Sequence, residues 1–292
     1  MMNIRRATPS DRERILAISA GVWEGNDYVP IVLDEWLTDP GGELLAVDVD
    51  GVLASFAYLT WLLPGHAWLQ GIRTDPAYRG KGIGRALSQA LVEKARQDGA
   101  VRISLSTYFD NTPSIRIIES LGFERVASFV FLERNREGPS LPPIEDPGIS
   151  QLTMEEAVRF VLASPYLATA RGWYPFEWLF FPLAARPDAF LGKTPYRIGT
   201  RREGTWRSVL CASAAREPEG PAFLSFLDGD PADFGALVAR ASRDLAAPAW
   251  EAMIPRRGDD VAQALPALRD LGFTPWQDGR EDVLCYELTA SP

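Results

Sequence analysis

The chain has 292 residues, of which 46% are hydrophobic and 24% are charged. These proportions are typical of a globular protein with one large domain or two ordinary ones. A formal charge of −9 argues against nucleic acid as the main partner and mildly favours cationic or neutral ligands.

The N-terminal residues contain no apolar signal core, and no stretch approaches the length of a membrane span. We therefore expect a cytosolic protein with no membrane partner. Cys211 and Cys285 lie in apolar, strand-like runs, so we expect two buried free thiols and no metal site. The single histidine, His66, follows Pro-Gly and is predicted to lie in a surface loop rather than to act as a base.

The chain begins with a short strand at Ile4, and two helices follow it. Thr8-Pro9-Ser10-Asp11 has the pattern of a helix start, and Asp39-Pro40-Gly41-Gly42 ends the second helix. Leu44 to Val49 and Val52 to Leu59 are predicted to form a hairpin through an Asp-Gly turn.

The most informative stretch of the sequence is LQGIRTDPAYRGKGIGRA, residues 69–86. A β-branched run ends at Asp75-Pro76, because proline cannot continue a sheet ladder. Three glycines follow at alternate positions (80, 82 and 84), and apolar residues then repeat at helical spacing as far as Gly99. The stretch therefore predicts a strand, a glycine-rich turn and the start of a helix.

This junction is suited to an anion. The first turn of a helix leaves N–H groups without partners at its positive end, and glycine lets a ligand approach the backbone closely. Arg79, Lys81 and Arg85 add positive charge, which predicts a phosphate or pyrophosphate site. A P-loop would need Ser or Thr after Lys81, and the dinucleotide fingerprint would need glycine in place of Leu87.

Two further signals close the first half of the chain. A strand is predicted from Val101 to Leu105, and Asn111-Thr112-Pro113-Ser114 then starts a helix. Gly122 of Leu121-Gly122-Phe123 ends that helix, and a last strand is predicted through Leu132. Glu137 to Gly148 is rich in proline, glycine and acidic residues, so we interpret it as a linker.

Arg79-x-x-Gly82-x-Gly84, Asn111-x-x-Ser114 and Leu-Gly-Phe, in this order of elements, resemble the GCN5-related N-acetyltransferase (GNAT) superfamily over roughly residues 3 to 134. The resemblance implies an α+β, three-layer fold: a mixed, mostly antiparallel sheet with helices on both faces. It also implies an enzyme that transfers acetyl from acetyl-CoA to an amine by direct attack in a ternary complex, with no metal.

The second half of the chain looks like a worn copy of the first. Leu-Gly-Phe at 121 recurs at 271, Asp-Pro at 75 recurs at 230, and Asp50-Gly51 matches Glu203-Gly204. Glu35-Trp36-Leu37 matches Glu177-Trp178-Leu179 in the same way. We therefore expect two GNAT folds in tandem: a catalytic domain at 1–136, a linker at 137–148, and a degenerate domain at 149–292. Carboxylates replace the phosphate loop in the second copy, which predicts that it does not bind CoA.

The resemblance also assigns roles to residues. It implies that backbone groups of the strand before the loop bind the pantetheine arm. It also implies that Gly71 marks a bulge, which separates this strand from its neighbour. The loop is implied to bind the pyrophosphate, and the start of the next helix is implied to contact the far side of the cofactor. The implied cofactor-binding residues are Ile72, Arg73, Thr74, Arg79, Gly80, Lys81, Gly82, Ile83, Gly84, Arg85, Asn111 and Ser114.

The catalytic groups are less well defined. Many family members use a tyrosine where this chain has Ile118, so Tyr108 is our candidate acid, with ring packing as the alternative. Glu24 and Asp27 are candidate bases, with solvated turn residues as the alternative. Arg73 could also pair with an acceptor carboxylate or with a surface acid. The predicted acceptor-binding residues are Trp23, Tyr28 and Gln70.

The segment around Trp23 to Pro30 also looks like histidine N-acetyltransferase and its relatives. This narrower resemblance implies a small-molecule acceptor with an α-amine, such as a free amino acid. A non-catalytic acyl-CoA sensor is the alternative function, and a purely structural protein is disfavoured because the loop is intact. We expect a monomer or a homodimer.

Overall fold

The structure is a computed structural model that describes residues 1–22, 25, 27–144, 148–217, 220–276 and 280–289. The chain divides into two compact units. Unit 1 comprises Met1–Thr107, Asn111–Glu124 and the C-terminal segment from Tyr286, and unit 2 comprises Tyr108–Asp110 and Arg125–Cys285. These boundaries differ from those expected at residues 136 and 149.

Unit 1 has the expected order of one strand, two helices, three strands, a helix, a strand and a helix. Strands β1 to β4 pair antiparallel in sequence order, and β4 pairs parallel with β5. The elements are β1 (Met2–Arg6), α1 (Arg12–Ser19), α2 (Val29–Thr38), β2 (Glu43–Val49), β3 (Val52–Leu63), β4 (His66–Thr74), α3 (Ile83–Gln97), β5 (Arg102–Tyr108) and α4 (Thr112–Ser120).

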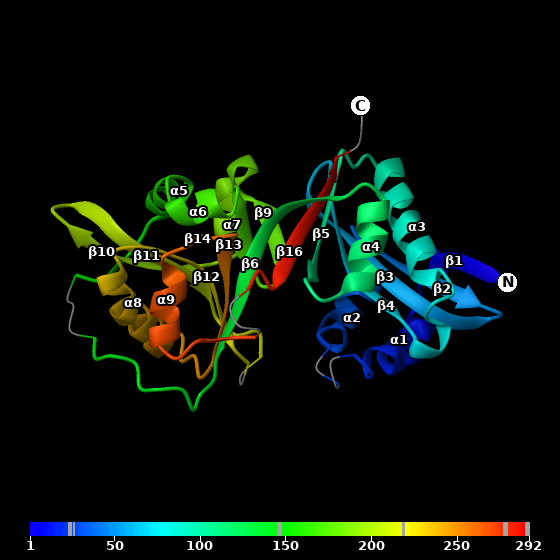
Figure 1. Ribbon diagram of the computed structural model, residues 1–292, viewed down its shortest axis with the longest axis horizontal. Coiled ribbons are helices and arrows are strands. Elements are labelled where there is room, and N and C mark those ends of the chain that lie inside the picture. The colour runs from blue at the N-terminus through cyan, green and yellow to red at the C-terminus, as the bar shows by residue number, and fades with distance from the viewer. Residues whose placement is uncertain (23–24, 26, 145–147, 218–219, 277–279, 290–292) are drawn as a thin grey trace. The chain divides into compact units, whose positions relative to one another are not determined.

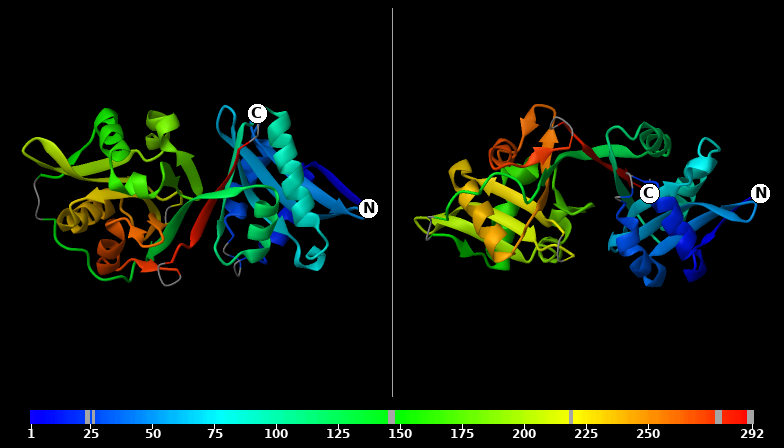
Figure 2. Two further views of the ribbon diagram at one scale, coloured as in Figure 1. Left: turned by 45° about the horizontal axis from the view of Figure 1, so that its top comes forward. Right: turned by 90° about the horizontal axis from the view of Figure 1, so that it is seen from below.

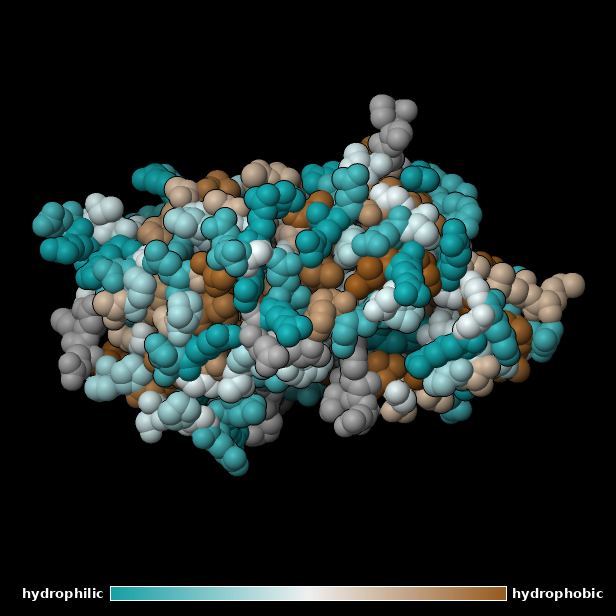
Figure 3. Space-filling model, in the orientation of Figure 1, coloured by the Kyte–Doolittle hydropathy of each residue, from teal (hydrophilic) through white to brown (hydrophobic). Residues whose placement is uncertain are grey.

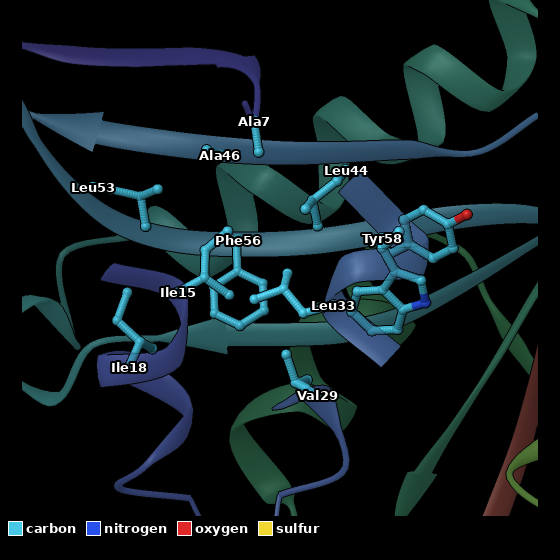
Figure 4. Close-up of a cluster of buried hydrophobic side chains, with 11 residues drawn as sticks. Ala7, Ile15, Ile18, Val29, Leu33, Leu44, Ala46, Leu53, Phe56 and Tyr58 are labelled. Carbon is cyan, nitrogen blue, oxygen red and sulfur yellow. The ribbon is translucent and has the colours of Figure 1, made fainter. Parts of the chain in front are cut away.

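Helices lie on both faces of the sheet of unit 1 (Figure 2). Ile15 and Ile18 of α1 and Leu33 of α2 are buried against Phe56 of β3, in the cluster shown in Figure 4. The amphipathic α3 contacts β3 and β4, and its apolar positions, such as Leu87, are buried. The predicted three-layer α+β arrangement is therefore present in this unit.

Unit 2 repeats this order with additions: a two-stranded hairpin and a short helix before β10, and the short strands β14 and β15 (Figure 1). Its main sheet has the order β6-β13-β12-β11-β10-β7. The elements are β6 (Glu124–Arg134), β7 (Ser150–Gln151), α5 (Met154–Leu162), α6 (Pro165–Thr169), the inserted β8 (Trp173–Phe176), β9 (Leu179–Pro182) and α7 (Pro187–Leu191), then β10 (Tyr196–Arg202), β11 (Thr205–Ser213), β12 (Ala222–Gly229), α8 (Pro231–Asp244), β13 (Trp250–Arg257), β14 (Asp260–Val261), α9 (Ala264–Asp270) and β15 (Thr274–Pro275). The last strand, β16 (Val283–Thr289), begins in unit 2 and continues into unit 1 from Tyr286.

The final strands of the two repeats are exchanged. The strand that follows α4 is β6, and it pairs with β13 of unit 2. The last strand of the chain, β16, lies next to β5 of unit 1 (Figure 1). The sequence pattern places β6 correctly along the chain but does not reveal which sheet it joins, since both sheets need one more apolar strand.

Polar contacts hold β16 in unit 1. Arg102 of β5 donates from Nε and Nη2 to the carboxylate of Glu287, at 2.9 and 3.0 Å. His66 lies beside this pair, with Nε2 at 2.7 Å from Ser104 Oγ and 3.7 Å from Glu287. His66 is therefore buried, in contrast to the surface loop expected for it, because β4 begins at this residue.

The repeat holds at most of the matched positions. Leu-Gly-Phe follows α4 and α9, and Asp75 and Asp230 cap the segments after β4 and β12 in the same way. The match of Glu35-Trp36-Leu37 with Glu177-Trp178-Leu179 is wrong, because the first lies in α2 and the second in the β8–β9 hairpin. Short sequence matches do not distinguish these environments. Cys211 and Cys285 are buried free thiols, as expected.

On the face seen in Figure 3, hydrophobic residues form small areas that are separated by hydrophilic ones. None of the helices in the described part of the chain is both long and apolar enough to span a bilayer.

Glu287→Gln should destabilise unit 1 by about 1–3 kcal/mol, because it leaves Arg102 without its charged partner at a half-buried position. Glu281→Gln is the matched control, since Glu281 pairs with the more exposed Arg125 in unit 2. Thermal unfolding of the two variants measures the difference. Equal melting temperatures would show that the Arg102 pair does not anchor β16.

His66 should make the stability of unit 1 pH-dependent. Burial, and secondarily Arg102, lowers the pKa of His66 from 6.5 to about 4. The folded state thus favours the neutral ring, so its contribution is complete above pH 6.5 and is lost as the pH falls towards 4, by up to about 3 kcal/mol. His66→Gln should flatten urea midpoints measured across this range, and an equally steep profile in the variant would contradict this assignment.

Candidate active site

The N terminus of α3 has a row of unpaired backbone amides. Gly82 precedes the helix with φ of 77° and offers no side-chain cap, and the first helical hydrogen bond runs from Ala86 N to Gly82 O. Among the described residues, the six amides from 80 to 85 donate to no acceptor. Unpaired amides of this kind form the positive end of the helix dipole.

The glycines leave this turn open on the side where a side chain would stand. A Cβ built on Gly80 or Gly82 would meet no atom within 4 Å, and both glycines have positive φ. Arg79, Lys81 and Arg85 are exposed, and none forms an ion pair with a described carboxylate. The loop therefore combines amides and cations in the pattern that binds phosphate groups.

The strand before this loop separates from its parallel neighbour. Pairing of β4 with β5 ends at Leu69 and Leu105, although both strands continue. On the other side of β4, Gly71 and Ile72 together oppose the single residue Ala57 of β3, which is a bulge at the position predicted for it. The fork between β4 and β5 therefore begins where the bulge occurs.

Two amides of β4 are directed into this fork. Asp75 N donates to Ala54 O, which sets the alternation of the antiparallel ladder. By this alternation the amides of Ile72 and Thr74 point away from β3, to the side where β5 no longer pairs. The buried Ser55 hydroxyl lies 2.9 Å from Thr74 Oγ1 and donates to Arg73 O, so it orients this end of β4.

The predicted residues of α4 lie at its start. Asn111 caps the helix by accepting from Ser114 N, and its Nδ2 donates to Thr107 at 3.2 Å. Both side-chain groups of Asn111 thus have internal partners. Ile118, where the resemblance implies a tyrosine, is buried.

Tyr108 belongs to unit 2. Its ring packs against Trp276 and Trp178, with centroids 4.9 and 5.3 Å away. These contacts match the packing alternative stated for Tyr108, and they give no support to its role as an acid.

Asp27 has both carboxylate oxygens bound to one guanidinium group. Arg73 Nε and Nη2 donate to them at 3.0 and 2.8 Å, and the Asp27 side chain is 1% exposed. The neighbouring Tyr28 is half-buried, and burial raises its pKa to about 12, so the hydroxyl stays protonated at neutral pH. A carboxylate engaged in this way is poorly placed to take a proton from an amine, in contrast to the predicted role.

The other acceptor-side predictions can be placed only in part. Trp23 and Glu24 lie outside the described residues. Gln70 lies on β4 directly before the bulge and opposite Tyr58 of β3.

Trp36 was not predicted as a site residue, yet its indole ring fills the space beside Gly71, where a Cβ would come within 2.5 Å of it. A glycine inside an otherwise apolar strand was the available signal.

In unit 2 the fork between the corresponding strands is filled by a side chain. Parallel pairing of β12 with β13 ends at Leu224 and Ala252. Beyond this point the Tyr166 hydroxyl lies within hydrogen-bonding distance of Ser225 O (2.9 Å) and Met253 O (2.5 Å), one from each strand. Tyr166 is fully buried, so it occupies the fork.

The corresponding helix start in unit 2 is capped by the chain itself. Asp230 accepts from Ala232 N at 2.9 Å and pairs with Arg207. Asp233, in the first turn of α8, accepts from the Ser208 hydroxyl at 2.7 Å. Two carboxylates thus take the place that an anion would take at α3.

Comparison with known proteins agrees with this geometry. Residues 11–123 match the Acetyltransferase (GNAT) family model. The N-alpha-acetyltransferase RimI of Mycobacterium tuberculosis is 30% identical over 129 residues, which cover 43% of this chain and 80% of that protein. The mycothiol acetyltransferase of Arthrobacter sp. is 33% identical over 105 residues, 34% of this chain but only 32% of that protein.

Two solved structures match over the whole length. A GCN5-related N-acetyltransferase from Sphaerobacter thermophilus has a TM-score of 0.65 at 16% identity, covering 100% of this chain and 96% of that one. A tandem GNAT protein from the clavulanic acid biosynthesis pathway has a TM-score of 0.62 at 15% identity, covering 100% and 99%. The predicted α+β tandem fold is thus confirmed, and the chain belongs to the GNAT family of N-acetyltransferases.

Proposed function

We propose that the protein transfers an acetyl group from acetyl-CoA to the amine of a small molecule, and that unit 1 carries the only acetyl-CoA site. The observation that carries this proposal is the row of unpaired amides from 80 to 85, beside the fork of β4 and β5. In unit 2 both features are occupied by the chain's own groups, Tyr166 and two aspartates.

In this proposal the amides of residues 80–85 bind the pyrophosphate, assisted by Arg79, Lys81 and Arg85. The amides of Ile72 and Thr74 bind the pantetheine arm as a β-strand would, because they point into the open fork. Asn111 and Ser114 mark the far side of the cofactor. Acetyl-CoA supplies the activated acyl group, and the chain's own residues hold it beside the acceptor.

An attacking amine must lose a proton, since it is mostly protonated near pH 7. Glu24 and Asp27 are the two predicted bases, and the bidentate pairing of Asp27 with Arg73 favours Glu24. For the acid that protonates the leaving thiolate, Tyr108 stays a prediction, and its ring packs on two tryptophans.

For the acceptor we favour an α-amine. The resemblance of the segment around Tyr28 to histidine N-acetyltransferase suggests it, and the similar protein of Mycobacterium tuberculosis is named an N-alpha-acetyltransferase. The mycothiol acetyltransferases are acetyltransferases named for a small molecule, but the matched stretch is about a third of their length. We propose a free amino acid or a similar small molecule as acceptor.

Gly82→Asp should weaken acetyl-CoA binding at least about tenfold, because it places a carboxylate at the phosphate position. Gly99→Asp is the matched control: it has positive φ and no atom within 4 Å of a built Cβ, and it lies at the other end of α3. Each substitution should destabilise the fold by about 1 kcal/mol through backbone strain. Titration calorimetry that finds equal affinities in the two variants would refute the loop assignment.

A panel of free amino acids, polyamines and peptides should include at least one amine that accelerates thiol release from acetyl-CoA. Gly82→Asp should abolish this release and Gly99→Asp should retain it. Binding of acetyl-CoA without release for any amine would favour the acyl-CoA sensor instead.

A further inference from the structure

The ion pair of Asp27 and Arg73 is buried beside the bulge of β4. Its two hydrogen bonds are 3.0 and 2.8 Å long, and the side chains are 1% and 14% exposed. A bidentate pair fixes the orientation of both groups. Burying such a pair is costly, and an apolar pair of similar volume often stabilises a fold as well. Stability alone therefore does not account for charged residues here.

The pair is continuous with the backbone of the bulge. Arg73 directly follows the bulge residues Gly71 and Ile72, and its Nη1 donates to Ile72 O at 3.2 Å. Asp27, which lies just before α2, thus orients an arginine that itself binds a peptide group of the bulge.

Aromatic rings support the same segment. The Arg73 guanidinium lies 5.6 Å from the centre of the Tyr28 ring. Trp36 packs edge-on against Tyr28 at 6.1 Å and stacks on Tyr58 at 4.6 Å, with its ring against Gly71. The bulge is therefore held on one side by packing and by the ion pair, while its Ile72 amide points to the open fork.

We propose that Asp27, Arg73 and Tyr28 are positioning residues. They fix the direction of the Ile72 amide and thereby the position at which the acetyl thioester binds. This inference rests on the proposed function, because the amide matters only if acetyl-CoA enters the fork. It gives Asp27 a role through Arg73 in place of proton abstraction. It also makes Arg73 a support of the cofactor strand rather than a partner for an acceptor carboxylate, since Asp27 balances its charge.

The test is the double variant Asp27→Leu/Arg73→Met, which removes the polar contacts without leaving a buried charge unpaired. Arg12→Met/Asp34→Leu is the matched control: this pair in the same unit is also bidentate, at 2.7 and 3.0 Å, but its side chains are 45% and 69% exposed. Calorimetry with acetyl-CoA, thermal unfolding and the amide NMR signals of Ile72 and Thr74 are measured for both variants and the wild type.

We expect the double variant to melt near the wild-type temperature but to bind acetyl-CoA about tenfold more weakly, with a smaller shift of the Ile72 amide on binding. The control should keep the wild-type affinity and shift. A folded double variant with wild-type affinity and an unchanged Ile72 shift would overturn the inference. Failure of the wild type to bind acetyl-CoA would instead overturn the proposed function.

Asp27→Asn serves if the double variant does not fold, because it keeps the shape of the side chain and weakens its contact with Arg73. It should lower acetyl-CoA affinity a few-fold and move the Gly71 and Ile72 amide signals in the free protein. Unchanged affinity together with unchanged signals would contradict a positioning role.

Discussion

Backbone amides without intramolecular partners, at the N terminus of α3, are the feature on which the account of this protein depends. An exposed helix start is normally capped by a side chain, because unpaired N–H groups at the positive end of the dipole favour an anion. Here the cap position is Gly82, which cannot supply one. The bulge at Gly71 and the fork of β4 and β5 have a similar effect on β4, because there too backbone amides are left to bind an external acceptor.

Unit 2 shows what the same topology does when no ligand is expected. It repeats the fork and the helix start, yet side chains of the same chain bind backbone groups at both places. Tyr166 bridges the diverging strands. Asp230 accepts from Ala232 N in the first turn of α8, and the Asp233 carboxylate beside it accepts from the Ser208 hydroxyl. The two units can therefore be compared directly. In unit 1 the amides of the site have no intramolecular partner, and in unit 2 side chains of the same chain occupy the equivalent places.

Much of this could be predicted from the sequence, because local chemistry decides it. Gly80 and Gly82 at positive φ, the Asp75 cap and the Gly71 bulge follow from residue types and spacing. The exchange of strands could not, since β6 and β16 are equally apolar and either would complete either sheet. The pairing of Asp27 with Arg73, the burial of His66 and the Tyr166 side chain in the fork depend on contacts between residues distant in sequence, which composition and periodicity do not encode.

A crystal structure of the full chain grown with excess acetyl-CoA tests the central claim most directly. The account predicts the pyrophosphate within hydrogen-bonding distance of the amides of residues 80–85, and the pantetheine arm along Ile72 and Thr74. Electron density for the coenzyme at the start of α8, between β12 and β13, or elsewhere on unit 2 with α3 unoccupied would contradict it.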